Sequence, residues 1–118
     1  MARILVVENE RDYWQVLACL LQEGGHRPSF AEDDCRGLIK LRERSFDVAL
    51  VDMGVSTGFS NRAINYANDE TQTVPIIMSG HGQQIVRTHF SEKDFPYFFY
   101  KHREEELNQI IEDALFSR

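Results

Sequence analysis

The sequence predicts an α/β fold of five βα units, (βα)5, built as a doubly wound, five-stranded parallel sheet with helices on both faces. Short apolar segments alternate along the chain with segments of helical periodicity, and this alternation is typical of a parallel sheet. The apolar segments have few polar interruptions, as expected where both faces of a sheet are covered. The chain has 118 residues, which is the size of one domain. We therefore expect a single domain over residues 1–118.

The first predicted unit contains a buried strand over residues 2–7 and a helix over residues 12–23. Apolar residues recur at helical spacing through that helix, and the pair beginning at Gly24 ends it. A short second strand follows over residues 26–30. It contains Pro28, which cannot donate a hydrogen bond to a ladder, so we expect this strand at or near an edge of the sheet.

The second helix and the third strand come next. Asp33 or Asp34 can cap a helix that runs to about residue 44. The apolar segment 46–51 predicts the third strand, and Asp52 closes it. Cys19 and Cys35, the two cysteines, fall in helical apolar patterns and are predicted to be buried thiols rather than a disulfide.

The remaining elements are predicted with less regular patterns. A loop rich in Gly, Ser and Thr over residues 53–60 leads to a helix over residues 61–70. A fourth strand spans residues 74–78, and a fourth helix is predicted over residues 83–90. The chain breaks near Pro96 before the fifth strand.

The fifth strand, over residues 97–100, precedes the clearest helical pattern in the chain. Apolar residues recur at i, i+3, i+4, i+7 and i+8 in the last helix, over residues 104–116. Its first turn is acidic, which suits the positive end of the helix dipole. The apolar stripe fits core packing and would equally suit a homodimer, so both readings stay open.

Composition narrows the classes of function. Hydrophobic residues make up 42% and charged residues 27% of the chain, as in globular proteins. The formal net charge of −6 argues against direct binding of nucleic acid or of an anionic membrane surface. No apolar run reaches the roughly 20 residues that span a bilayer. The first residues become acidic too early for a signal peptide, so we expect a cytoplasmic protein.

Polar residues stand at the carboxyl ends of four of the predicted strands. An acidic cluster, Glu8 to Glu10, follows the first strand, and Asp52 follows the third. Ser79 ends the fourth strand and Lys101 the fifth. Ligands of open α/β sheets bind at this edge, so the sequence predicts one site with Asp52 at its centre.

The residue types at this edge suit an aspartate that accepts a phosphoryl group. Such an aspartate needs a divalent cation, a fixed ammonium group and a hydroxyl group to hold the phosphoryl oxygens. Magnesium prefers oxygen ligands. Lys101 can supply the ammonium and Ser79 the hydroxyl. The candidate metal ligands are the side-chain oxygens of Glu8, Asn9 and Asp52 and the backbone carbonyl of Gly54.

At these positions the sequence resembles the receiver domains of two-component response regulators, over about residues 2–116. The motifs that carry the resemblance are Ile4–Glu10, Val48–Asp52, Pro75–Gly80 and Tyr97–Lys101. None is specific alone, but their order and spacing together are. The resemblance implies a CheY-like, flavodoxin-like fold with strand order 2-1-3-4-5.

The resemblance also implies a role for each site residue. Asp52 would be the phosphoacceptor, phosphorylated with Mg²⁺ by a histidine kinase or a phosphotransfer protein. Lys101 would contact the phosphoryl group, Ser79 would move towards it, and the rotamer of Phe98 would follow. The switched surface would bind a downstream effector protein or domain. The chain would assist its own phosphorylation without turning over an independent substrate.

Three departures from the family pattern bear on these roles. Asn9 stands where the family has a second acid, so we expect weaker binding of Mg²⁺. The loop after Asp52 lacks the usual proline, and His102 replaces the proline that normally follows the lysine. These changes support an alternative, a pseudo-receiver that binds a partner protein independently of phosphorylation. A flavodoxin-like cofactor binder is disfavoured, because the acidic cluster after the first strand would repel a phosphate.

Simpler explanations of single residues also stand. An aspartate after a strand often caps a turn, so Asp52 alone does not define a site. Lys101 can be a structural ion-pair partner of Asp52, and Ser79 can satisfy the turn at Gly80. His81 and His102 are predicted to be exposed turn residues.

Overall fold

The computed structural model describes residues 1–54 and 61–118, and in this part of the chain five parallel strands form one sheet in the order β2-β1-β3-β4-β5. The predicted fold class and strand order are confirmed. Strand β2 lies at an edge, as Pro28 indicated. The strands are β1 (Arg3–Val7), β2 (Arg27–Ala31), β3 (Val48–Asp52), β4 (Val74–Ser79) and β5 (Phe98–Tyr100).

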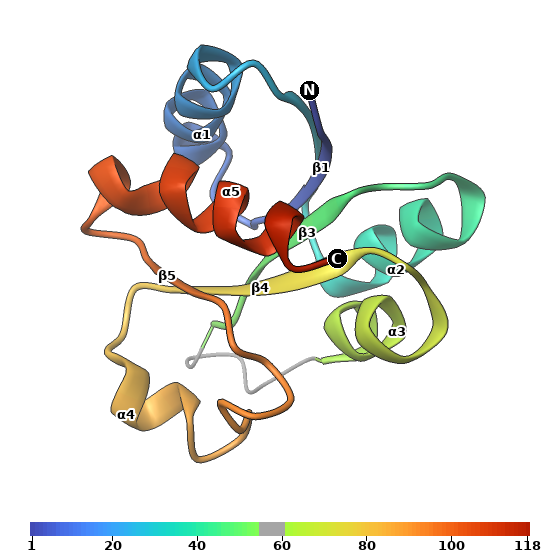
Figure 1. Ribbon diagram of the computed structural model, residues 1–118, viewed down its shortest axis with the longest axis vertical. Helices are drawn as coiled ribbons and strands as arrows, with labels where there is room; N and C mark the ends of the chain where they lie inside the picture. The colour runs from blue at the N-terminus through green and yellow to red at the C-terminus, as the bar shows by residue number, and fades with distance from the viewer. Residues whose placement is uncertain (55–60) are drawn as a thin grey trace.

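Helices cover both faces of the sheet (Figure 1). Helices α1 and α5 pack on one face, and α2 and α3 pack on the other. In the described residues no helix is long and apolar enough to cross a membrane. The helices are α1 (Arg11–Glu23), α2 (Asp34–Glu43), α3 (Arg62–Glu70), α4 (Gln83–Val86) and α5 (Leu107–Phe116), with a 3₁₀ turn η1 (Glu104–Glu106) before α5.

Strand β1 lies between β2 and β3 in the sheet and is buried on both faces. Leu5 and Val7 face the core under α2 and α3, while Ile4 and Val6 face the core under α1 and α5. Each of the four is at most 4% exposed. The alternation follows the two-residue period of a strand. Because β1 is packed on both faces, the position of the residues that directly follow it, Glu8 to Glu10, is closely defined.

Helix α2 lies unusually close to β1 because Gly37 has no side chain. A Cβ atom at Gly37 would come within 2.7 Å of a methyl group of Val7. This approach brings the start of α2 against the start of α3. There, Asp34 Oδ1 accepts a hydrogen bond from the Ala63 N–H at 2.9 Å, and its Oδ2 lies 3.2 Å from Nε of Arg62. A side chain of α2 therefore caps α3.

The fourth helix is shorter than the predicted span of 83–90. Helix α4 ends at Val86, and hydrogen bonds from Arg87 hold the chain beyond it. The Arg87 guanidinium donates to the carbonyl of Phe95 at 2.6 Å and to that of Phe90 at 3.3 Å. The two phenyl rings also pack edge to face, with their centroids 5.2 Å apart. The backbone beyond Val86 continues in turns, with the Phe90 N–H donating to the carbonyl of Val86 at 3.0 Å, and the contacts of Arg87 and the two rings hold it.

Three smaller differences concern boundaries and thiols. The last helix begins as a 3₁₀ turn and becomes α-helical at Leu107, and β3 begins at Val48 and includes Asp52. The prediction that Cys19 and Cys35 are buried is wrong, because both are exposed, free cysteines. Both lie on helices, on the sides turned away from the sheet, so proximity to apolar residues in sequence was misleading. Of the predicted 53–60 loop, residues 55–60 lie outside the described residues.

Candidate functional site

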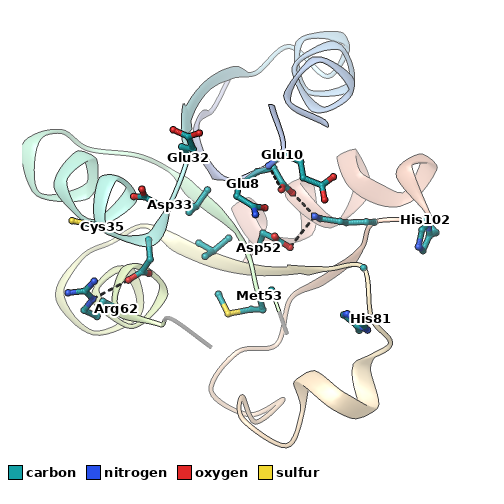
Figure 2. A pocket seen from close by; sticks show the side chains of 17 residues that line it. Glu8, Glu10, Glu32, Asp33, Cys35, Asp52, Met53, Arg62, His81 and His102 are labelled. Atoms are coloured by element: carbon teal, nitrogen blue, oxygen red, sulfur yellow. Dashed lines mark hydrogen bonds and ion pairs between the residues drawn. The ribbon is translucent and has the colours of Figure 1, made fainter. Parts of the chain in front are cut away.

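A cavity of about 700 Å³ opens at the carboxyl edge of the sheet. Its wall includes the residues that follow β1 and β3, the turn between β2 and α2, the start of α3, and the residues after β4 and β5. Figure 2 shows Glu8 and Asp52 near the middle of this wall, with Arg62 towards one side and His81 and His102 towards the other. Predicted site residues from three strand ends therefore meet in one cavity.

The centre of the site is one ammonium group between two carboxylates. Lys101 Nζ lies 2.5 Å from Oε1 of Glu8 and 3.2 Å from Oδ1 of Asp52, as the dashed lines in Figure 2 mark. The side chain of Glu8 is 0% exposed, that of Asp52 13% and that of Lys101 17%. The three groups are thus largely withdrawn from water, where charges interact more strongly than at a surface.

Burial and neighbouring charges shift the protonation equilibria of this group. Burial, followed by the negative charge of Glu8, raises the pKa of Asp52, and the nearby Lys101 offsets only part of this effect. For Lys101, burial acts to lower the pKa, but its contacts with Glu8 and Asp52 outweigh burial and raise the pKa. Lys101 is therefore held in its charged form, and the carboxylate of Asp52 is more basic than an exposed one.

Glu8 is held in place from three sides. Its Oε2 accepts a hydrogen bond from the Glu10 N–H at 2.9 Å, and its backbone N–H donates to the carbonyl of Ala31 at 2.9 Å. The indole N–H of Trp14 donates to the carbonyl of Glu8 at 2.7 Å. Trp14 stacks in turn on Phe30, with ring centroids 5.1 Å apart. Trp14 is the one tryptophan of the chain, so its fluorescence is a local probe of this corner.

Two residues of α1 at this site were missed in the sequence, Trp14 and Tyr13. The Tyr13 hydroxyl donates to the carbonyl of Lys101 at 2.9 Å and lies 3.2 Å from Oε1 of Glu104. Lys101 Nζ lies 5.3 Å from the centroid of the Tyr13 ring. Their position in the sequence could have indicated this role, because both residues lie in the first turns of the helix that directly follows the acidic residues after the first strand.

The two predicted switch residues lie outside the cavity wall. Ser79 is fully buried, and its Oγ accepts a hydrogen bond from the His81 N–H at 2.9 Å. Its neighbours Gly80 and His81 line the cavity instead. Phe98 is half-buried beneath the guanidinium of Arg87, 5.9 Å from the ring centroid. The Ser79 hydroxyl is thus engaged with the backbone of the β4–α4 turn.

The cavity contains the types of oxygen atom that bind a magnesium ion. Asn9 and Gly54 line the cavity beside Glu8 and Asp52, and carboxylate, amide and carbonyl oxygens are ligands that Mg²⁺ accepts. Across the described residues, however, no three His, Cys, Asp or Glu side chains come together as a metal-binding group. A cation here would therefore depend on Asn9 and a carbonyl as well as on the two carboxylates, and it would share both carboxylates with Lys101.

The far side of the cavity carries charged residues that the sequence did not assign to the site. Asp34 and Arg62 form the ion pair between α2 and α3, and Asp33 caps α2 by accepting from the Arg36 N–H at 2.8 Å. Cys35 lies beside them at the cavity wall. Asp33 and Asp34 thus have helix-capping roles. His81 and His102 are exposed, as predicted.

Comparison with known proteins adds a family context to this geometry. No protein-family model matches the sequence, and no curated protein sequence matches it either. Solved structures do match. A receiver domain of a response regulator from Clostridium thermocellum superposes with a TM-score of 0.84 at 23% identity, covering 99% of this chain and 96% of that one. The chain folds as a response regulator receiver domain.

Two further receiver structures support the same fold. The receiver domain of NtrC4 from Aquifex aeolicus is 26% identical, with a TM-score of 0.78 and coverage of 97% of this chain and 96% of that one. The response regulator TrrA from Thermotoga maritima is 21% identical, with a TM-score of 0.82 and coverage of 98% and 100%. TrrA was crystallised in complex with Mg²⁺–BeF. The resemblance inferred from the strand-end motifs is therefore confirmed at the level of the receiver fold.

Proposed function

We propose that the chain is a signal-transduction receiver in which Asp52 accepts a phosphoryl group from a histidine kinase or a phosphotransfer protein. The observation that carries this proposal is the contact of Lys101 with both Asp52 and Glu8 inside the cavity. An ammonium group fixed beside an acceptor carboxylate can stabilise the oxygens of a phosphoryl group during its transfer. The raised pKa of Asp52 is consistent with a more nucleophilic carboxylate.

The proposed transfer uses few protein groups. An oxygen of the Asp52 carboxylate forms a bond to phosphorus while the bond from phosphorus to the donor nitrogen breaks, and the imidazole of the donor keeps that electron pair and a proton. Lys101 stays protonated and pairs with a phosphoryl oxygen. The side chains of Glu8, Asn9 and Asp52 and the carbonyl of Gly54 would hold Mg²⁺, which supplies positive charge opposite the phosphoryl oxygens.

Asn9 lowers the negative charge available to that cation. Glu8 and Asp52 carry two negative charges and Lys101 one positive charge, and Asn9 adds an oxygen without charge. Mg²⁺ sites in proteins usually contain one or two carboxylates, and here Lys101 already offsets part of the charge of the two that are present. We therefore expect Mg²⁺ to bind only at millimolar concentration. We further propose that phosphorylation moves Ser79 and Phe98 and so changes the surface that an effector protein recognises.

Beryllofluoride, which mimics a phosphoryl group on aspartate, tests the proposal directly. With millimolar Mg²⁺ it should change the fluorescence of Trp14 and shift the NMR signals of Ser79 and Phe98. Asp52→Asn, which keeps the shape of the side chain but removes the acceptor oxygen charge, should abolish both changes. A wild-type protein that shows no change with Mg²⁺ and beryllofluoride would contradict phosphorylation at Asp52.

The alternative is a pseudo-receiver that binds its partner without phosphate. It is favoured by the shorter of the two ion pairs, the 2.5 Å contact between Lys101 and Glu8, because this ammonium already neutralises a carboxylate that a cation would use. Under this alternative, Asp52→Ala leaves the biological output intact. Loss of output in a folded Asp52→Ala protein would rule the alternative out.

A further inference from the structure

We propose that Tyr13 is a positioning residue for Lys101, fixing its backbone through the phenol hydroxyl and its ammonium group through the ring. The inference rests on the proposed function only where it concerns phosphorylation. Its structural content, that Tyr13 sets where the Lys101 ammonium lies, stands by itself.

The sheet fixes only the N–H of Lys101, and Tyr13 fixes its carbonyl. Strand β5 ends at Tyr100. The Lys101 N–H donates to the carbonyl of Ser79 at 2.9 Å, which is the last ladder-like bond at this edge. The Lys101 carbonyl accepts from the Tyr13 hydroxyl at 2.9 Å. The peptide groups on both sides of the Lys101 Cα are thus held, one by β4 and the other by α1.

The ring of Tyr13 acts on the other end of the same side chain. Lys101 Nζ lies 5.3 Å from the ring centroid, within the range at which an ammonium is attracted to the face of an aromatic ring. Glu8 and Asp52 occupy other sides of the ammonium. The four-carbon chain of a lysine is flexible, and contact at both of its ends restricts it.

The hydroxyl of Tyr13 stays a donor throughout the working pH range. Burial, followed by the negative charge of Glu104, raises the pKa of Tyr13 well above its usual value. The single proton is shared between the Lys101 carbonyl at 2.9 Å and Glu104 Oε1 at 3.2 Å. The shorter contact is the one to Lys101.

The position of the Lys101 ammonium group matters because both Glu8 and Asp52 form ion pairs with it. Its distance to Glu8 is 2.5 Å and to Asp52 3.2 Å. A small displacement of the Lys101 backbone therefore changes how much of its charge reaches Asp52. Tyr13 touches neither carboxylate through a hydrogen bond and acts on the site through Lys101.

Two substitutions separate the hydroxyl from the ring. Tyr13→Phe removes the hydrogen bond to the Lys101 carbonyl and keeps the ring, while Tyr13→Leu removes both. Tyr66→Phe is the matched control, because it deletes a phenol hydroxyl from a half-buried tyrosine of α3 outside the site. Thermal unfolding of each variant establishes that it is folded at the assay temperature. If Tyr13→Leu does not fold, Tyr13→Phe carries the test.

The first measurement follows Lys101 itself through the NMR chemical shift of its ε-methylene group, at one fixed pH and in the protein without phosphoryl donor. We expect both Tyr13 variants to shift this signal, with Tyr66→Phe matching wild type. A purely structural role of Tyr13 would lower thermal stability and leave this signal in place. Lys101 signals that coincide in wild type and both Tyr13 variants would overturn the inference.

The second measurement is the initial rate of Asp52 phosphorylation by acetyl phosphate with Mg²⁺. Loss of one neutral hydrogen bond should slow Tyr13→Phe about threefold to tenfold, and loss of the ring as well should slow Tyr13→Leu about thirtyfold. Equal rates in wild type and Tyr13→Leu would overturn the inference. If wild type is not phosphorylated at all, the proposed function fails instead, and the Lys101 NMR signal alone decides the role of Tyr13.

Discussion

At the scale of single residues, the site depends on how one positive charge is divided between two negative ones. Glu8 is completely buried and cannot be hydrated, so its charge relies on Lys101 and on the Glu10 N–H. Asp52 is slightly exposed and keeps the weaker contact. Removing one partner of a buried ion pair leaves an uncompensated charge, which costs more than the pair contributes. We therefore expect Lys101 to have a structural role besides the one proposed for it in phosphoryl transfer.

This view predicts the effect of removing Lys101. Lys101→Met should lower the free energy of unfolding by about 2–4 kcal/mol at neutral pH, because Glu8 and Asp52 then repel each other without a counter-charge. Adding Glu8→Gln to Lys101→Met should recover at least half of the loss. Urea unfolding of the single and double variants measures both effects. A double variant no more stable than Lys101→Met would show that the buried charge of Glu8 is not the cause.

Single residues also show where prediction from sequence succeeds and where it stops. Glu8, Asp52 and Lys101 were predictable because each follows a strand of one parallel sheet, and the sheet brings strand ends together. The roles of Tyr13 and Trp14 were not, because they depend on how α1 is rotated about its axis and how far it lies from β5. The spacing of apolar residues predicts which side of a helix is buried. It does not predict which residue each side chain contacts.

At the scale of elements, the position of α3 depends on α2. The cap residue of α3, Asn61, makes no side-chain hydrogen bond to the helix, and Asp34 of α2 supplies the missing acceptor to Ala63. The close approach of α2 to β1 at Gly37 makes this reach feasible. The sequence predicted Asp33 or Asp34 as a cap for α2. It could not predict that Asp33 takes that role while Asp34 caps a helix more than 20 residues later.

The shared cap gives a prediction for α3. Asp34→Ala should lower the free energy of unfolding by about 1 kcal/mol, the usual value of a helix cap, and should speed amide exchange at Ala63. Asp34→Asn keeps an acceptor oxygen but loses the ion pair with Arg62, which is largely exposed and contributes little. It should therefore remain close to wild type. Hydrogen exchange followed by NMR gives the local effect, and urea unfolding gives the global one. Unchanged exchange at Ala63 in Asp34→Ala would contradict the cap.

The segment after α4 is the element for which local sequence was least informative. A helix over residues 83–90 was predicted, and the chain instead leaves the helix at Val86. Beyond Val86 the backbone continues in turns to Phe90, and Arg87 donates to the carbonyl of Phe95, which lies outside the predicted helix. Tertiary contacts of this kind override helix propensity, which is a weak preference for each residue.

At the scale of the whole molecule, the pKa values of aspartates at the two ends of the strands shift in opposite directions. At the amino edge, Asp47 accepts a hydrogen bond from the Arg3 N–H at 2.8 Å and pairs with Arg118 at 2.6 Å. The hydrogen bond from Arg3 lowers the pKa of Asp47, burial opposes part of this effect, and the hydrogen bond and charge of Arg118 add to the lowering. At the carboxyl edge, burial and Glu8 raise the pKa of Asp52. The two edges therefore hold their carboxylates in opposite electrostatic environments.

The two edges should therefore respond to pH with opposite signs. A lowered folded-state pKa means that ionised Asp47 stabilises the protein above the ordinary aspartate pKa of about 3.9, and this stabilisation is lost as the pH falls below that value. A raised folded-state pKa means that ionised Asp52 destabilises the protein at neutral pH, and this penalty disappears as Asp52 becomes protonated on acidification. Asp47→Asn should thus be less stable than wild type at about pH 7, and the difference should shrink as the pH falls below about 3.9. Asp52→Asn should be more stable than wild type at about pH 7 and lose its advantage as the pH falls. Urea unfolding of the three proteins across this range measures the sign of each difference. A wild-type protein more stable than Asp52→Asn at neutral pH would mean that the pairing with Lys101 outweighs burial at this edge.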